Sequence, residues 1–255
     1  MKAITDNGTK YCVFIIFMSI YTHHPKKVNG CFVNYLCDFC CKMECHSFEF
    51  GPFAENTYIL IGEEKQCIIV DPGCYNAHEE IILTDFIQSR NLHPVALLNT
   101  HAHIDHIMGN EYVKHKWNVP LYLSHLDIPL FERAESMAAL WNLKYTPSPQ
   151  PDIDLQKGTL ELAGLSLEVR HVPGHAPGHM VFIHHDSKTV ICGDTLFQGS
   201  IGRTDLPGGN HEELLSSIRE QLFTLPDDYT LHCGHGPSTT VGHERAHNPF
   251  FSAGS

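Results

Sequence analysis

The spacing of apolar residues predicts short strands alternating with helices from residue 43 onward. NTYILIG (56–62) and QCIIVDPG (66–73) are β-branched runs separated by Glu-Glu-Lys, which predicts a β-hairpin. The continuous apolar run VALLNT (95–100) indicates a strand buried on both faces. Between them a helix is expected over residues 77–90, where apolar side chains recur at helical spacing: Ile81, Ile82, Phe86 and Ile87.

The loop THAHIDH, directly after the last of these strands, carries three histidines and one aspartate. A helix is expected to follow, from about Asp105 to Trp117. His101 and His103 are separated by one residue, so both imidazoles can point to one side and chelate one ion. Asp105 and His106 lie on the next turn and suit a second ion nearby. Because ligands of α/β sheets gather at the carboxyl ends of strands, this loop favours a metal site over a solvated polar loop.

Three later segments also end an apolar strand with a candidate ligand. EVRHVPGHAPGHMVFI predicts a strand, a glycine-rich turn bearing His175 and a second strand. TVICGDTLF is a buried run that ends at Asp194, and YTLHCGHGPSTT runs into His235. All four loops could therefore converge on one rim of a sheet.

Composition narrows the class of protein. The 255 residues are 42% hydrophobic, enough for one large α/β domain or two small ones. With 17 Lys+Arg against 29 Asp+Glu the net charge is -12, and no basic stripe is present, so nucleic acid is not expected as a partner. The 20 histidines fit metal binding or acid–base chemistry.

Residues 1–42 differ in composition from residues 43–255, which form the predicted main domain. They hold five of the ten cysteines, and their apolar run 11–21 is too short to span a bilayer as a helix. We favour translation from Met43, with the upstream residues disordered or not made. A cleaved or anchoring signal and a zinc site at the CxxC of Cys37 and Cys40 are the alternatives. We expect a cytoplasmic protein without a membrane partner.

The motifs resemble those of the metallo-β-lactamase fold superfamily over nearly all of residues 45–250. THAHIDH matches the HxHxDH signature, PGHAPGH the third-loop histidine, CGDTLF the bridging aspartate and GHGP the last histidine. GDTLFQGSIGRTDLPGG followed by GHGPSTTVGHERAHNP is similar to the compact bacterial branch of glyoxalase II, the hydroxyacylglutathione hydrolases. The resemblance implies an αββα sandwich of two mixed sheets, with the site at one edge.

The resemblance also implies the ligand sets. A first metal ion would be held by His101, His103 and His175, a second by Asp105, His106 and His235, and Asp194 would bridge them. Two divalent ions, zinc with iron or manganese as alternatives, would activate water as hydroxide to attack the thioester carbonyl. Asp105 would orient this nucleophile or receive its proton.

The implied reaction is thioester hydrolysis, with S-lactoylglutathione as the first substrate to consider. The chain ends 20 residues after His235, without the C-terminal helical domain of the larger glyoxalase II enzymes, so another small thioester or an ester remains possible. A persulfide dioxygenase with a single iron and a β-lactamase are the rival activities. The sequence does not indicate an oligomeric state.

Several other polar residues admit two interpretations. Arg203 could grip a substrate carboxylate or pair with Asp205 to fix its own loop. His171 and His179 flank the His175 turn and could support ligands or satisfy local hydrogen bonds. We expect four further histidines at surface or strand-edge positions: His184, His185, His243 and His247.

Overall fold

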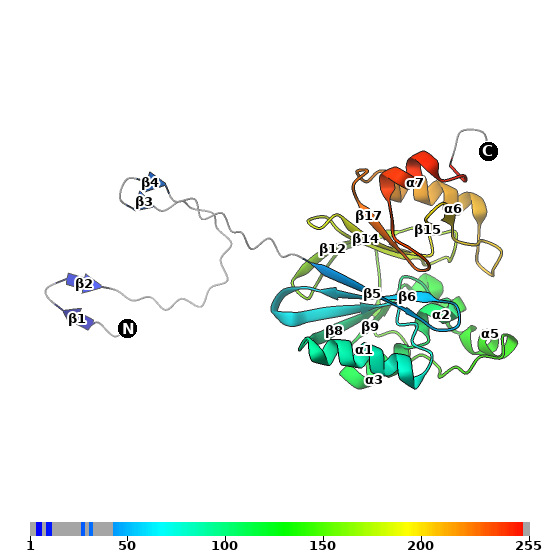
Figure 1. The fold of residues 1–255 in the computed structure, drawn as a ribbon, viewed down its shortest axis with the longest axis horizontal. Helices are drawn as coiled ribbons and strands as arrows, with labels where there is room; N and C mark the ends of the chain where they lie inside the picture. Colours follow the sequence, from blue (N-terminus) through cyan, green and yellow to red (C-terminus); the bar gives the residue numbers. More distant parts are fainter. Residues whose placement is uncertain (1–3, 7–8, 12–26, 29–30, 33–42, 252–255) are drawn as a thin grey trace. The chain divides into compact units, whose positions relative to one another are not determined.

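The computed structural model describes residues 4–6, 9–11, 27–28, 31–32 and 43–251 (Figure 1). The chain forms two units, residues 1–39 and 40–255. The first unit contains two short antiparallel hairpins: β1 (Ile4–Asp6) with β2 (Thr9–Tyr11), and β3 (Lys27–Val28) with β4 (Cys31–Phe32). The predicted signal-like run lies outside the described residues except for Tyr11, as do Cys37 and Cys40.

The second unit begins with a mixed sheet in the order β10-β9-β8-β7-β6-β5. Its strands are β5 (Glu44–Phe50), β6 (Glu55–Ile61), β7 (Gln66–Val70), β8 (His93–Leu98), β9 (Leu121–Leu123) and β10 (Ile153–Asp154). β6 pairs antiparallel with β7 through the short 3₁₀ turn η1 (Glu63–Lys65), which confirms the predicted hairpin. β7 to β10 run parallel, so their carboxyl ends meet at one edge.

The second sheet has the order β11-β12-β13-β14-β17-β18 and is also mixed. Its strands are β11 (Gly158–Leu162), β12 (Leu165–His171), β13 (Met180–His184), β14 (Thr189–Gly193), β17 (Thr230–Cys233) and β18 (Thr239–Thr240). β14 and β17 are parallel, and the small hairpin of β15 (Leu196–Phe197) and β16 (Ser200–Ile201) follows β14.

The two sheets pack face to face around an apolar core. Tyr58, Leu60 and Ile68 of the first sheet belong to the same buried cluster as Leu167 and Phe182 of the second. Each fully buried side chain of this size stabilises the fold by about 1.5–3 kcal/mol relative to exposure. This core fixes the edges of the two sheets against each other.

Helices cover both outer faces, which confirms the predicted αββα sandwich (Figure 1). On the first sheet lie α1 (Ala77–Ser89) and α3 (Asn110–Trp117). On the second lie α6 (His211–Ser217) with the π-helical turn η3 (Ile218–Leu222), and α7 (Val241–His247). No helix in the described part of the chain is long and apolar enough to cross a membrane.

Two predictions about helices need correction. α1 buries Leu83 and Ile87, whereas Ile81 and Ile82 are 55% and 36% exposed, so the predicted apolar face was partly wrong. The single helix expected from about Asp105 is two helices, α2 (Ile104–Ile107) and α3.

Gly109 marks the break between α2 and α3. Its amide donates to the Pro72 carbonyl at 2.7 Å, and a Cβ at this position would lie 2.4 Å from the Cys74 Sγ. Only glycine lets the chain turn this closely against the 72–74 loop. The break ends α2 directly after the ligand-type residues.

A helical segment between β9 and β10 covers the edge where the parallel strands end. It comprises the 3₁₀ turn η2 (His125–Asp127), α4 (Ile128–Phe131) and α5 (Ala134–Leu140). The loop after α5 contains Pro147, Pro149 and Pro151 and has no regular structure.

Candidate metal centre

The structure brings all seven predicted ligand side chains to one edge of the sandwich. Four come from the loop after β8 and the start of α2, and the other three follow β12, β14 and β17 of the second sheet. They are His101, His103, Asp105, His106, His175, Asp194 and His235. Both sheets therefore contribute to one cluster, as the sequence predicts.

His101, His103 and His175 form the first compact group. Their candidate ligand nitrogens lie within 4.8 Å of one another. The Nε2 of His175 is 2.8 Å from the Nδ1 of His103 and 3.2 Å from the Nε2 of His101. Three nitrogens at this separation can face one cation.

Asp105, His106 and His235 form the second group, again within 4.8 Å. The Nε2 of His235 is 3.1 Å from the Asp105 Oδ2. Asp194 lies between the groups, because its Oδ2 is 3.5 Å from the Nε2 of both His175 and His235. Its Oδ1 is 3.4 Å from the His106 Nε2, so one carboxylate reaches both groups.

Hydrogen bonds at the Nδ1 atoms fix three of the imidazole rings. The Nδ1 of His175 lies 2.7 Å from the Arg203 carbonyl, and the Nδ1 of His235 lies 3.0 Å from the Phe53 carbonyl. The Nδ1 of His106 lies 3.0 Å from the Asp71 carboxylate. Because each acceptor requires a protonated Nδ1, the Nε2 lone pairs face the centre and can bind a metal ion.

Unpaired buried atoms support the fit to metal ions. The His106 Nε2 and the Asp194 Oδ1 are buried and have no hydrogen-bond partner in the described part of the chain. Buried polar atoms are rarely left unpaired, and imidazole with carboxylate is a donor set for zinc, iron or manganese. Gly234 allows this crowding, since a Cβ there would lie 2.0 Å from the Asp194 Oδ1.

Electrostatics favour a positive charge in this cluster. Burial opposes a charge on His106, but the carboxylates of Asp194 and Asp105 raise its pKa well above the ordinary value. Burial also opposes ionisation of Asp194, yet the neighbouring His106 and His175 hold its pKa below the usual range. Burial lowers the pKa of His101 well below its ordinary value, which keeps it neutral. A metal ion bound there would displace the proton from the His106 Nε2, because neutral imidazole and ionised carboxylate are the forms that bind metals.

Supporting carboxylates were missed by the sequence reasoning. Asp71, at the end of β7, accepts hydrogen bonds from the Thr100 hydroxyl at 2.6 Å and from the His106 ring. Asp127 accepts from the amides of Ala102 at 2.9 Å and Gly178 at 2.5 Å. For Asp71 a signal existed, because VDPG ends a buried strand in the same way as the other loops do.

The remaining polar residues resolve differently. His179 is fully buried, stacks on His101 at 4.7 Å between ring centroids and accepts from the Asp194 amide, so it supports the cluster. The His171 Nε2 donates a hydrogen bond to the nearby Pro177 carbonyl. His184 is buried and bonded to Ser187, so the expected surface position was wrong.

The predicted surface position holds for the other three histidines: His185, His243 and His247 are exposed. Arg203 makes two 2.8 Å hydrogen bonds to the Asp205 carboxylate, as the loop-fixing interpretation predicts. Its side chain nevertheless lines the cleft described next. Cys192 and Cys233 are buried in strands.

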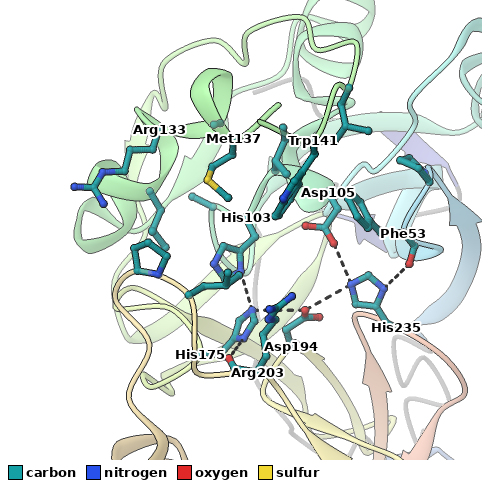
Figure 2. Close-up of a pocket in the computed structure, with 18 of the residues that line it drawn as sticks. Phe53, His103, Asp105, Arg133, Met137, Trp141, His175, Asp194, Arg203 and His235 are labelled. Carbon is teal, nitrogen blue, oxygen red and sulfur yellow. Dashed lines mark hydrogen bonds and ion pairs between the residues drawn. The ribbon is translucent and has the colours of Figure 1, made fainter. Parts of the chain in front are cut away.

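A cleft of about 900 Å³ opens over the cluster (Figure 2). His103, Asp105, His175, Asp194 and His235 line its floor. The covering segment supplies much of its wall, and Figure 2 shows Met137 and Trp141 on the side of the cleft opposite the floor. The geometry therefore combines a buried polar floor with an apolar wall.

Comparison with known proteins identifies relatives of the whole second unit. Residues 50–235 match the family described as the metallo-beta-lactamase superfamily. The probable metallo-hydrolase YqgX of Bacillus subtilis is 39% identical over 212 residues, which cover 82% of this chain and 98% of that protein. The hydroxyacylglutathione hydrolase GloC of Haemophilus influenzae is 38% identical over 206 residues, 80% of this chain and 95% of that protein.

Two solved structures are also similar to this chain. TTHA1623, solved in a di-iron-bound form, has a TM-score of 0.73 at 38% identity and covers 80% of this chain and 99% of its own. The BLEG-1 B3 metallo-beta-lactamase has a TM-score of 0.74 at 32% identity, with 82% and 100% covered. The fold is thus shared with proteins of different names, and TTHA1623 was solved with iron bound.

Proposed function

The chain belongs to the metallo-beta-lactamase superfamily, and from this premise we propose that it is a dinuclear metal-dependent hydrolase that cleaves small thioesters. S-lactoylglutathione is the first substrate to test, which would yield lactate and free glutathione. The similarity to a hydroxyacylglutathione hydrolase supports this choice. Zinc is the proposed metal, with iron or manganese as alternatives, and the di-iron relative supports two ions.

One observation carries the proposal: two groups of three ligand-type residues share the carboxylate of Asp194 beneath an open cleft. We propose that His101, His103 and His175 hold one ion, Asp105, His106 and His235 the other, and Asp194 both. When bound there, divalent ions would supply Lewis-acid activation of the carbonyl and of water.

The chain's own residues would position the reacting atoms. Water adds its oxygen to the thioester carbonyl carbon, the C–S bond breaks, and sulfur leaves with the electron pair and gains a proton. Asp105 lines the cleft, and we propose that its carboxylate orients the water or accepts its proton. The helical segment over the cleft lines it with apolar side chains, among them Leu130, Met137 and Leu140.

Arg203 is a proposed substrate contact that also has a role in fixing its own loop. It lines the cleft, while its guanidinium is already bonded to Asp205. Its backbone carbonyl accepts the bond that orients His175, so the Arg203 loop also positions a proposed ligand.

The test is hydrolysis of S-lactoylglutathione by the full chain loaded with zinc, with metal content measured on the same sample. We expect turnover with two bound ions, and we expect His175→Ala to lose first-site metal and most of the rate. His185→Ala is the matched control, since His185 is exposed and bonded to Glu168 and Tyr229 instead. An unchanged rate and metal content in His175→Ala would remove that residue from the site.

The rival activities give distinct outcomes on the same sample. Turnover of nitrocefin but not of the thioester would assign a β-lactamase, in line with the BLEG-1 similarity. A single bound iron with oxygen uptake on glutathione persulfide would assign a dioxygenase. Two bound metals without turnover of either substrate would redirect the search to other thioesters and esters.

A further inference from the structure

The cleft has two chemically different ends. In Figure 2, Phe53 and His235 lie at one side of the view, whereas Arg133, His103 and His175 lie at the other. The residues at the two sides differ accordingly, with Phe53 at the first and Arg133 at the second, while Arg203 lies between them beside His175 and Asp194 (Figure 2). A thioester whose carbonyl lies over the floor would extend its acyl group toward one end and its thiol carrier toward the other.

The first end is built from aromatic side chains around His235. Phe53 and Trp141 meet edge to face with ring centroids 5.3 Å apart, and Phe197 lies 6.2 Å from the His235 ring. Phe53 and Trp141 remain 39% and 37% exposed although both are large and apolar. Apolar surface left open inside a cleft is a binding surface for an apolar group.

The second end carries positive charge. Arg133 and Arg203 are the cations among the described residues that line the cleft. Arg203 is held by Asp205, whereas Arg133 makes no ion pair within the described part of the chain. An acidic thiol carrier such as glutathione, with two carboxylates and one ammonium group, is complementary to this end.

We propose that this enzyme prefers thioesters with an aromatic or similarly bulky apolar acyl group, which packs on Phe53 and Trp141 while the acidic carrier extends toward Arg133. The inference rests on the proposed thioesterase function and names its substrate class. The methyl group of a lactoyl thioester covers little of the aromatic end, whereas a phenyl group in its place can contact both rings.

The experiment compares S-mandeloylglutathione with S-lactoylglutathione, using the full chain loaded with zinc. The two thioesters share the carrier, the α-hydroxyl and the reacting carbonyl, and differ in phenyl against methyl. We expect kcat/KM to be at least about tenfold higher for the mandeloyl thioester, as pocket contacts of this size allow. We expect Trp141→Ala and Phe53→Ala each to lower the ratio of the two values severalfold, with Trp141→Phe retaining most of it.

Two further variants test the orientation and the background. Arg133→Glu should raise KM for both thioesters alike, since they share the carrier, and leave their ratio unchanged. Trp117→Ala removes the other tryptophan, which packs on Tyr112 away from the cleft, and should not alter the ratio.

The outcomes separate the inference from the function beneath it. A ratio at or below one, or a ratio unchanged in both Trp141→Ala and Phe53→Ala, would overturn the acyl preference while the thioesterase stands. Absence of turnover for both thioesters with two metals bound would overturn the inference and remove glutathione thioesters from the proposed function.

Discussion

At the scale of single residues, Asp71 shows how one buried carboxylate can orient histidines in both proposed ligand groups. Its oxygens accept from the Thr100 amide at 2.7 Å, the Thr100 hydroxyl at 2.6 Å and the His106 Nδ1 at 3.0 Å. Because the Thr100 hydroxyl donates to Asp71, it can accept from the His101 Nδ1, which is 3.0 Å away. One side chain thereby turns the Nε2 atoms of His101 and His106 toward the centre.

The substitution Asp71→Asn should weaken metal binding roughly 10- to 100-fold, the usual effect of removing a partner that orients a ligand. Asparagine presents one acceptor oxygen where aspartate presents two, so the Thr100 amide, the Thr100 hydroxyl and the His106 Nδ1 can no longer all be satisfied. Competition titration with a chelator of known affinity would measure the change. Asp85→Asn, at an exposed position of α1, is the matched control. Equal affinities of the two variants would contradict the role of Asp71.

At this scale the sequence predicts side chains that lie close together along the chain and misses those that meet only through the fold. His101 and His103 could be assigned to one ion because two residues alternate on an extended strand end. Asp71 and His106 are 35 positions apart, and only the parallel pairing of β7 with β8 places one beside the other. The same limit explains His184, since no local pattern shows that its strand position is covered.

At the scale of elements, Asp127 joins the loop after β8 to the turn before β13. It stands at the end of η2, fully buried, and its two oxygens accept the amides of Ala102 and Gly178. Ala102 lies between His101 and His103, and the Gly178 turn carries His175. The covering segment is thus tied to both halves of the first proposed metal group.

Asp127→Asn should destabilise the fold by about 1–3 kcal/mol, because an amide can accept one of the two N–H groups and leaves the other buried without a partner. Urea unfolding at pH 8, followed by circular dichroism, would measure the change. A loss within error of zero would show that the two loops hold their positions without this carboxylate.

The pH dependence of the wild-type protein gives an independent check. Burial raises the pKa of Asp127 to about 6 from 3.8, against the opposing amides of Gly178 and Ala102. Since the folded pKa is the higher one, this group's contribution is fully present below pH 3.8 and is lost as the pH rises through about 6. The Asp127→Asn variant should lack that slope, so the difference in unfolding free energy between wild type and variant should change with pH between about 3.8 and about 6.

The spacing of apolar residues predicted which segments are strands and which are helices. It did not predict where a helix is interrupted or which of its faces is buried. The hairpin of β6 with β7 and the buried strand β8 stand as predicted, because β-branched runs with clear turn signals leave few alternatives. The break at Gly109 was missed, since an isolated glycine within a helical pattern is usually tolerated. In α1, Ile81 and Ile82 face the solvent because Leu83 and Ile87 pack on the sheet beneath. The sequence pattern alone could not decide which of these side chains would be buried.

At the scale of the whole molecule, the proposed metal centre joins the two sheets. His101, His103, Asp105 and His106 follow the first sheet, and His175, Asp194 and His235 follow the second. Asn56 of β6 adds a direct link, since its side-chain amide donates to the carbonyls of Cys233 at 3.0 Å and Gly236 at 2.8 Å. The loop that bears His235 is therefore held against the opposite sheet even apart from any ion.

Metal binding should accordingly stabilise the whole second unit rather than a single loop. Ions that bind the folded chain alone raise its stability by about 2.7 kcal/mol at 100 times their dissociation constant. For a unit of this size that corresponds to a rise in Tm of roughly 5 to 11 °C. Differential scanning fluorimetry of the full chain in EDTA and after zinc addition would measure it. Asp194→Ala removes the carboxylate that lies within 3.5 Å of histidines in both groups and should lose most of the zinc-dependent shift. If Tm were the same in EDTA and in zinc, the cluster would have no part in holding the two sheets together.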